Sequence, residues 1–131
     1  MPDVGYSIYY IPGDFADTKK YNMIRLSGDL DLFNDGTFRV MRAAGHTPGS
    51  QFAVVRLPKT GPVILTSDVV YLKESLDKNL IPPIPGTWSP MGMYEGYQRI
   101  RQVRDGENAQ IFYGHDPEVF KATKHAPEFY D

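Results

Sequence analysis

The sequence contains no cysteine. Disulfides and thiolate metal ligands are therefore excluded, and any metal ion must be bound by His, Asp, Glu or backbone oxygen atoms. Catalysis by a nucleophilic cysteine is excluded for the same reason. Histidine is scarce, with three residues in a chain of 131, so the candidates for a metal site are few.

The chain also lacks an excess of one charge and lacks long apolar runs. Its 14 basic and 16 acidic residues give a formal net charge of -2, without the basic excess typical of nucleic-acid binding, so we expect no nucleic-acid partner. The longest apolar runs, residues 52–55 and 62–65, fall far short of the roughly 20 residues that span a bilayer, and we expect no membrane partner. The first residues lack the basic start and apolar stretch of a secretory signal, which favours a cytoplasmic location.

The composition is that of one globular domain. Hydrophobic residues make up 41% and charged residues 23% of the 131 positions, which are ordinary values for such a domain. No internal repeat, low-complexity tract or linker divides the sequence. We therefore predict a single domain over residues 1–131, with an irregular, aromatic-rich start over residues 1–21.

Alternation of apolar and polar residues predicts a meander of β-strands. Turn-forming residues at 34–36 and 58–61 separate some of these strands, as expected for antiparallel neighbours. A last strand of buried type follows much later in the chain. The predicted strands are residues 28–33, 38–43, 52–57, 62–66 and 109–113.

One strong helix is predicted over residues 90–104. Ser89 and Pro90 resemble an N-cap followed by proline at the first helical position, and Asp105 and Gly106 would end the helix. Its apolar residues recur at spacings of three: Tyr94, Tyr97, Ile100 and Val103. Shorter helices are expected over residues 72–79 and from Pro117 onwards, and the proline-rich residues 82–86 predict a flexible or lid-like loop. The mixture indicates an α/β fold with largely antiparallel strands.

Three polar residues stand just beyond predicted strands. His46 lies in a Gly-His-Thr-Pro-Gly loop, Asp68 follows the strand ending at residue 66, and His115 follows the strand ending at residue 113. Imidazole nitrogen and carboxylate oxygen suit zinc, and a carboxylate can bridge two cations. Taken singly, each residue has an ordinary explanation as a surface or helix-capping residue. Together they predict a partial metal site.

The sequence around these residues resembles the C-terminal half of the metallo-β-lactamase superfamily. The matching motifs are Gly-His-Thr-Pro-Gly-Ser (45–50), Leu-Thr-Ser-Asp (65–68) and Phe-Tyr-Gly-His-Asp (112–116). The resemblance implies two zinc ions, with His46 binding one, Asp68 bridging both and His115 binding the other. It also implies half of an αββα sandwich, namely one largely antiparallel sheet with helices packed on one face. It covers most of residues 28–120.

Within that superfamily the N-acyl-homoserine lactonases are the best match, because Asp68-Val69-Val70-Tyr71 resembles their Asp-x-x-Tyr motif. The resemblance implies a small-molecule lactone or ester substrate and ring opening of N-acyl-homoserine lactones, which is quorum quenching. It gives Tyr71 a catalytic role as a hydrogen-bond donor to the lactone or to the developing oxyanion. The alternative for Tyr71 is a structural tyrosine at a strand end.

The superfamily's other ligand set, a His-x-His-x-Asp-His stretch, is absent from this sequence. His125, the remaining histidine, lies in a polar segment and is assigned no role. We therefore expect little or no activity from this chain alone. Three explanations stay open: a fragment of a longer lactonase, a half-enzyme completed by a complementary N-terminal half or a homo-oligomer partner, and a non-catalytic binding or structural module.

Overall fold

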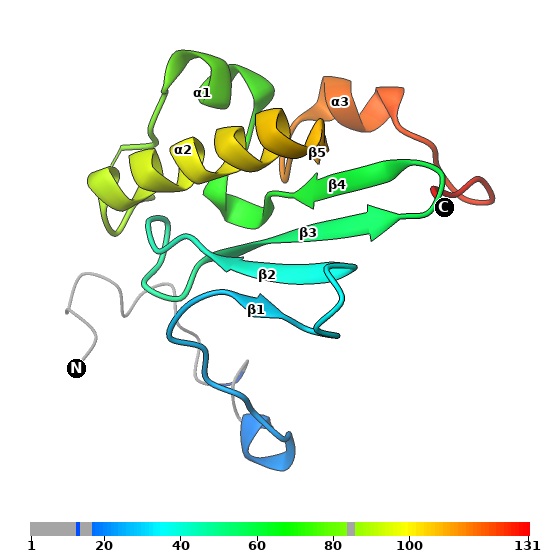
Figure 1. The fold of residues 1–131 in the computed structure, drawn as a ribbon. Helices are drawn as coiled ribbons and strands as arrows, with labels where there is room; N and C mark the ends of the chain where they lie inside the picture. The colour runs from blue at the N-terminus through cyan, green and yellow to red at the C-terminus, as the bar shows by residue number, and fades with distance from the viewer. Residues whose placement is uncertain (1–12, 14–16, 84–85) are drawn as a thin grey trace.

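The computed structural model describes residues 13, 17–83 and 86–131, which form a five-stranded sheet with helices (Figure 1). The strands lie in the sheet in chain order. Neighbours from the first to the fourth strand are antiparallel, and the fifth is parallel to the fourth. The strands are β1 (Leu30–Asp31), β2 (Phe38–Arg42), β3 (Gln51–Leu57), β4 (Gly61–Leu65) and β5 (Gln110–Phe112). The predicted α/β fold with one largely antiparallel sheet is confirmed.

Helices α1 (Lys73–Lys78) and α2 (Pro90–Glu107) pack on one face of this sheet. Because side chains alternate along a strand, Phe52 and Val54 of β3 both point to that face and are buried. The core that they share with both helices also contains Ile64, Leu76, Met93, Tyr97, Ile100 and Ile111. The short helix α3 (Pro117–Ala122) follows β5 and buries none of its residues. No helix in the described ranges is long and apolar enough to cross a membrane.

The start of α2 forms as predicted. The Ser89 side chain accepts a hydrogen bond from the Gly92 N–H at 3.0 Å, and Pro90 occupies the first helical position. The apolar residues that recur at spacings of three do not all face the core, because Tyr94 is 42% exposed whereas its neighbour Met93 is buried. The helix turns 100° per residue, so a strict spacing of three drifts off the buried stripe.

The predicted end of α2 was wrong. The helix continues through Gly106 to Glu107 and ends at Asn108, which adopts the left-handed conformation with φ 52°. A glycine inside a helix costs about 1 kcal/mol relative to alanine. Here the last turn is held by Glu107, whose two carboxylate oxygens accept from Arg39 of β2 at 2.6 Å and from Arg56 of β3 at 2.9 Å. These contacts across the sheet extend the helix beyond its local stop signal.

The first predicted strand is shorter than expected. Pairing of β1 covers only Leu30 and Asp31, and the side chains of Leu32 and Phe33 are 50% and 64% exposed. The Asp31 carboxylate accepts from the Gly36 N–H at 2.7 Å and so closes the turn early. The irregular start expected over residues 1–21 falls largely outside the described residues; the part that is described contains a 3-10 turn, η3 (Thr18–Lys20).

The face of the sheet opposite the helices is also apolar. One row of cross-strand partners runs over all five strands on this face: Leu30, Val40, Ala53, Leu65 and Phe112. None of the five is fully buried, and Leu65 is 41% exposed. A sheet that is apolar on both faces is typical of a layer covered on both sides. We call this row the open face.

Candidate metal centre

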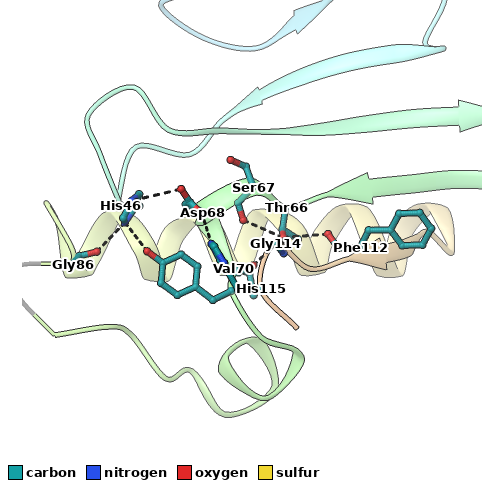
Figure 2. A network of polar contacts seen from close by, with 10 residues as sticks. His46, Thr66, Ser67, Asp68, Val70, Gly86, Phe112, Gly114 and His115 are labelled. Atoms are coloured by element: carbon teal, nitrogen blue, oxygen red, sulfur yellow. Dashed lines mark hydrogen bonds and ion pairs between the residues drawn. The ribbon is translucent and has the colours of Figure 1, made fainter. Parts of the chain in front are cut away.

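The three predicted metal ligands meet at one edge of the sheet (Figure 2). β2, β4 and β5 run in the same direction, because β2 and β4 are each antiparallel to β3 and β5 is parallel to β4. Their carboxyl ends therefore lie at a common edge. His46 follows β2, Asp68 lies in the 3-10 turn η4 (Ser67–Val69) after β4, and His115 follows β5.

Both histidines face the same carboxylate. His115 Nε2 lies 2.8 Å from Asp68 Oδ1, and His46 Nε2 lies 3.8 Å from Asp68 Oδ2. The side chain of His46 is 25% exposed, that of Asp68 46% and that of His115 59%. Each oxygen of Asp68 thus has its own imidazole, and the group is accessible from solvent.

The protonation of His46 is set by a backbone carbonyl. His46 Nδ1 lies 2.8 Å from the oxygen of Gly86, and since a carbonyl oxygen only accepts, Nδ1 carries the proton. In the neutral ring, the lone pair of Nε2 then points towards the Asp68 carboxylate. Nε2 can pair with Asp68 by taking up a second proton, or it can offer its lone pair to a cation. Imidazole nitrogen and carboxylate oxygen are donors that suit zinc, so the residues at this edge fit such an ion.

Tyr71 lies against both histidines. Its hydroxyl oxygen is 3.1 Å from His46 Nδ1, and its ring makes edge contacts with the rings of His46 and His115 at centroid distances of 5.7 and 4.7 Å. Burial, and then the nearby charge of Asp68, raise the pKa of Tyr71 above its ordinary value. Because Nδ1 carries a proton that it gives to the Gly86 carbonyl, it cannot accept from Tyr71, whose own O–H is therefore free to donate elsewhere.

Within the described part of the chain, no three His, Asp or Glu side chains are grouped so as to hold one ion. Under the assignment implied by the resemblance, His46 and Asp68 would serve one ion, and Asp68 and His115 the other. Each ion would then take two ligands from this chain. Structural and catalytic zinc sites use three or four protein ligands, so further ligands must come from elsewhere.

Sequence reasoning did not find the contribution of Gly86, because a backbone carbonyl has no signature in the sequence. The loop over 82–86 was predicted to be flexible or lid-like, but its described ends are anchored: Thr87 is buried and donates to the Pro82 carbonyl at 2.7 Å, and the Trp88 N–H donates to the His46 carbonyl at 3.1 Å. His125, which was given no role, packs its ring against Phe120 at 4.4 Å between centroids.

The chain is similar to known lactonases in sequence and in structure. It is 35% identical over 101 residues to the N-acyl homoserine lactonase AttM of Azorhizobium caulinodans, a match that covers 77% of this chain and 38% of that protein. A solved N-acyl homoserine lactone hydrolase, with the product N-hexanoyl-L-homoserine at its catalytic metal centre, superposes with a TM-score of 0.70 and 29% identity over 81% of this chain and 40% of the other. The dizinc quorum-quenching lactonase AidC shares the fold, with a TM-score of 0.52 and 19% identity over 78% of this chain and 33% of its own. No protein-family model matches the chain.

The fold and these neighbours show that this chain has the metallo-β-lactamase type of fold. The solved neighbours of the chain include metal-dependent hydrolases. Within this class, the chain is similar to part of the N-acyl homoserine lactonases, which is consistent with a partial lactonase-like chain. It spans 38% of the length of the AttM protein that it matches.

Proposed function

We propose that this chain forms one side of a dinuclear zinc site in a quorum-quenching lactonase that opens the ring of N-acyl homoserine lactones. The observation that carries the proposal is the convergence of His46 and His115 on the two oxygens of Asp68. The donor set of neutral imidazole and carboxylate suits zinc. The lactone substrate is supported by the similarity to AttM and to a product-bound lactone hydrolase.

The roles of the residues follow from their positions. Zinc, when bound, supplies Lewis acidity towards the carbonyl of the substrate. Asp68 would hold both ions, while the Gly86 carbonyl orients His46 so that its Nε2 faces Asp68. Tyr71, held protonated by its raised pKa, donates a hydrogen bond to the oxygen that gains negative charge during attack on the lactone.

The rest of the site comes from a complementary half. The sequence contains no His-x-His-x-Asp-His stretch, and the open face of the sheet exposes apolar side chains that a covering layer would bury. A complementary N-terminal half, as part of a longer chain or as a separate polypeptide, would cover this face and add the missing ligands. The competing candidate is a non-catalytic binding module. The observation that favours it is that this chain would supply only two ligands to each ion.

The proposal is tested by metal analysis and a lactonase assay on the 131-residue chain, alone and mixed with a polypeptide carrying the His-x-His-x-Asp-His half of a related lactonase. Alone, the chain should hold zinc weakly or not at all and should not hydrolyse N-hexanoyl homoserine lactone. With the complementary half, zinc retention and turnover should appear together. Turnover by the chain alone, with two tightly held ions, would contradict the need for a second half. Failure of the mixture, despite formation of the complex, would favour the non-catalytic module.

Replacing Tyr71 with Phe should lower kcat of the completed enzyme by about 100-fold, the size of effect seen when one oxyanion donor is removed. Zinc content should stay unchanged, because the hydroxyl is not among the proposed ligands. The matched control is Tyr94→Phe, which removes the same group from an exposed position of α2 and should leave kcat unchanged. Equal activity of the Tyr71→Phe variant and the wild type would assign Tyr71 a packing role only.

A further inference from the structure

Thr66 is a buried polar residue between the two segments that carry Asp68 and His115. It directly follows β4 and precedes η4, and its contacts are drawn in Figure 2. Its exposed fraction is 0%. Its hydroxyl donates to the Val70 carbonyl at 2.8 Å and accepts from the Gly114 N–H at 3.1 Å. The same oxygen lies 3.3 Å from the Ser67 carbonyl and 3.2 Å from the Phe112 carbonyl. One side chain thus contacts backbone atoms of both the segment that carries Asp68 and the segment that carries His115.

Backbone hydrogen bonds flank this hydroxyl. The Thr66 N–H donates to the Phe112 carbonyl at 3.1 Å, and the His115 N–H donates to the Tyr71 carbonyl at 3.0 Å. Between these two bonds, the Gly114 N–H has the Thr66 hydroxyl at 3.1 Å and the Val70 carbonyl at the longer distance of 3.4 Å. The hydroxyl therefore provides the better partner for this amide and fills a break in the pairing of the two segments.

The two segments are in direct backbone contact at this point. A Cβ atom on Gly114 would lie 2.6 Å from the Ser67 carbonyl oxygen, so this approach requires glycine. Ser67 itself has φ 49°, in the left-handed region that a serine rarely adopts. A strained residue next to Asp68 persists only when its surroundings hold it, and the contacts of Thr66 supply that hold.

We infer that Thr66 is a positioning residue that fixes Asp68 and His115 relative to each other. It touches neither imidazole nor carboxylate, and acts through the Val70 and Gly114 backbone. This inference rests on the proposed function, because the pair that it positions is the proposed bridging carboxylate and one of its histidines. Loss of the hydroxyl would remove the 2.8 Å bond to the Val70 carbonyl and leave only the 3.4 Å bond between that carbonyl and the Gly114 amide, and the two loops would separate.

The test compares the wild-type 131-residue chain with Thr66→Val, which removes the hydroxyl at nearly equal volume, and Thr66→Ser, which keeps it. The first readout needs no metal: the nuclear Overhauser contact between the Tyr71 and His115 rings, whose centroids are 4.7 Å apart. The second is the affinity for Co²⁺ of each chain mixed with the complementary half, followed by its visible absorbance. Thr66→Val should lose the ring contact and bind Co²⁺ about 10- to 100-fold more weakly, as for other residues that orient metal ligands. Thr66→Ser should retain both properties.

An unchanged ring contact and Co²⁺ affinity in Thr66→Val, or an equal loss in Thr66→Ser, would overturn the inference. If the wild type together with the complementary half binds no Co²⁺ but the ring contact responds as expected, the positioning role is supported and the proposed metal site fails. Should Thr66→Val not fold, Gly114→Ala serves instead, because its Cβ must displace the Ser67 carbonyl. That variant should also lose the ring contact, and a retained contact would overturn the inference.

Discussion

Replacing Asp68 with Asn should lower the affinity for Zn²⁺ or Co²⁺ of the complex between the chain and the complementary half by at least about 100-fold. Residues that only orient metal ligands already cost 10- to 100-fold when changed, and a bridging ligand should cost no less. The amide keeps the shape of the carboxylate but loses its charge, and one of its two oxygens becomes an NH₂ donor. Since the Asp68 side chain is 46% exposed, the fold should persist. Co²⁺ titration measures the metal affinity, and thermal unfolding followed by circular dichroism measures the stability of the fold.

The control for this variant is Asp105→Asn. Asp105 is an exposed acid near the end of α2, paired with Arg104 rather than with a histidine. Its replacement removes the same charge from the chain and should leave metal affinity unchanged. If Asp68→Asn binds metal as the wild type does, then Asp68 is not a ligand and the bridging assignment is wrong.

Replacing Gly92 with Ala should destabilise the fold by about 3 kcal/mol, at the upper end of the cost of overfilling a packed site. The added Cβ would lie 2.0 Å from the Ala44 carbonyl oxygen, and a Cβ on Gly45 would lie 2.4 Å from the Met93 nitrogen. Both clashes are with backbone atoms, which cannot rotate away. The first turn of α2 therefore sits directly on the loop of His46, and the variant should also displace that histidine and weaken metal binding.

Gly106→Ala is the matched control, because it makes the same substitution in the same helix. Nothing lies within 4 Å of its added Cβ, and its backbone is helical, so this variant should stabilise the fold by about 0.5–1 kcal/mol. Urea unfolding of the two variants and the wild type gives both values. Equal stabilities of the two variants would show that the contact between α2 and the His46 loop yields easily.

The elements that sequence analysis predicted well are those with a local cause. The N-cap at Ser89 and the alternation of β3 depend on neighbouring residues and appear as expected. The extension of α2 to Glu107 could not be predicted, because Arg39 and Arg56 lie 68 and 51 residues away along the chain. The early end of β1 depends on a carboxylate that bends the chain back onto itself. For α2 a tertiary contact outweighed the local stop signal, whereas β1 ends at a side-chain-to-backbone bond within its own turn.

By itself, the sequence determined which side chains could carry metal chemistry. Without cysteine and with three histidines, it left His46, Asp68 and His115 as a set placed after strands, and it showed that a second ligand motif is absent. Only the tertiary structure decided how this set is arranged: two histidines share one carboxylate, the Gly86 carbonyl fixes the proton on His46, and the Thr66 hydroxyl joins the segments of Asp68 and His115. The physical reason is that these relations depend on backbone atoms and on partners far apart in the chain, and they exist only once the sheet has aligned the carboxyl ends of β2, β4 and β5.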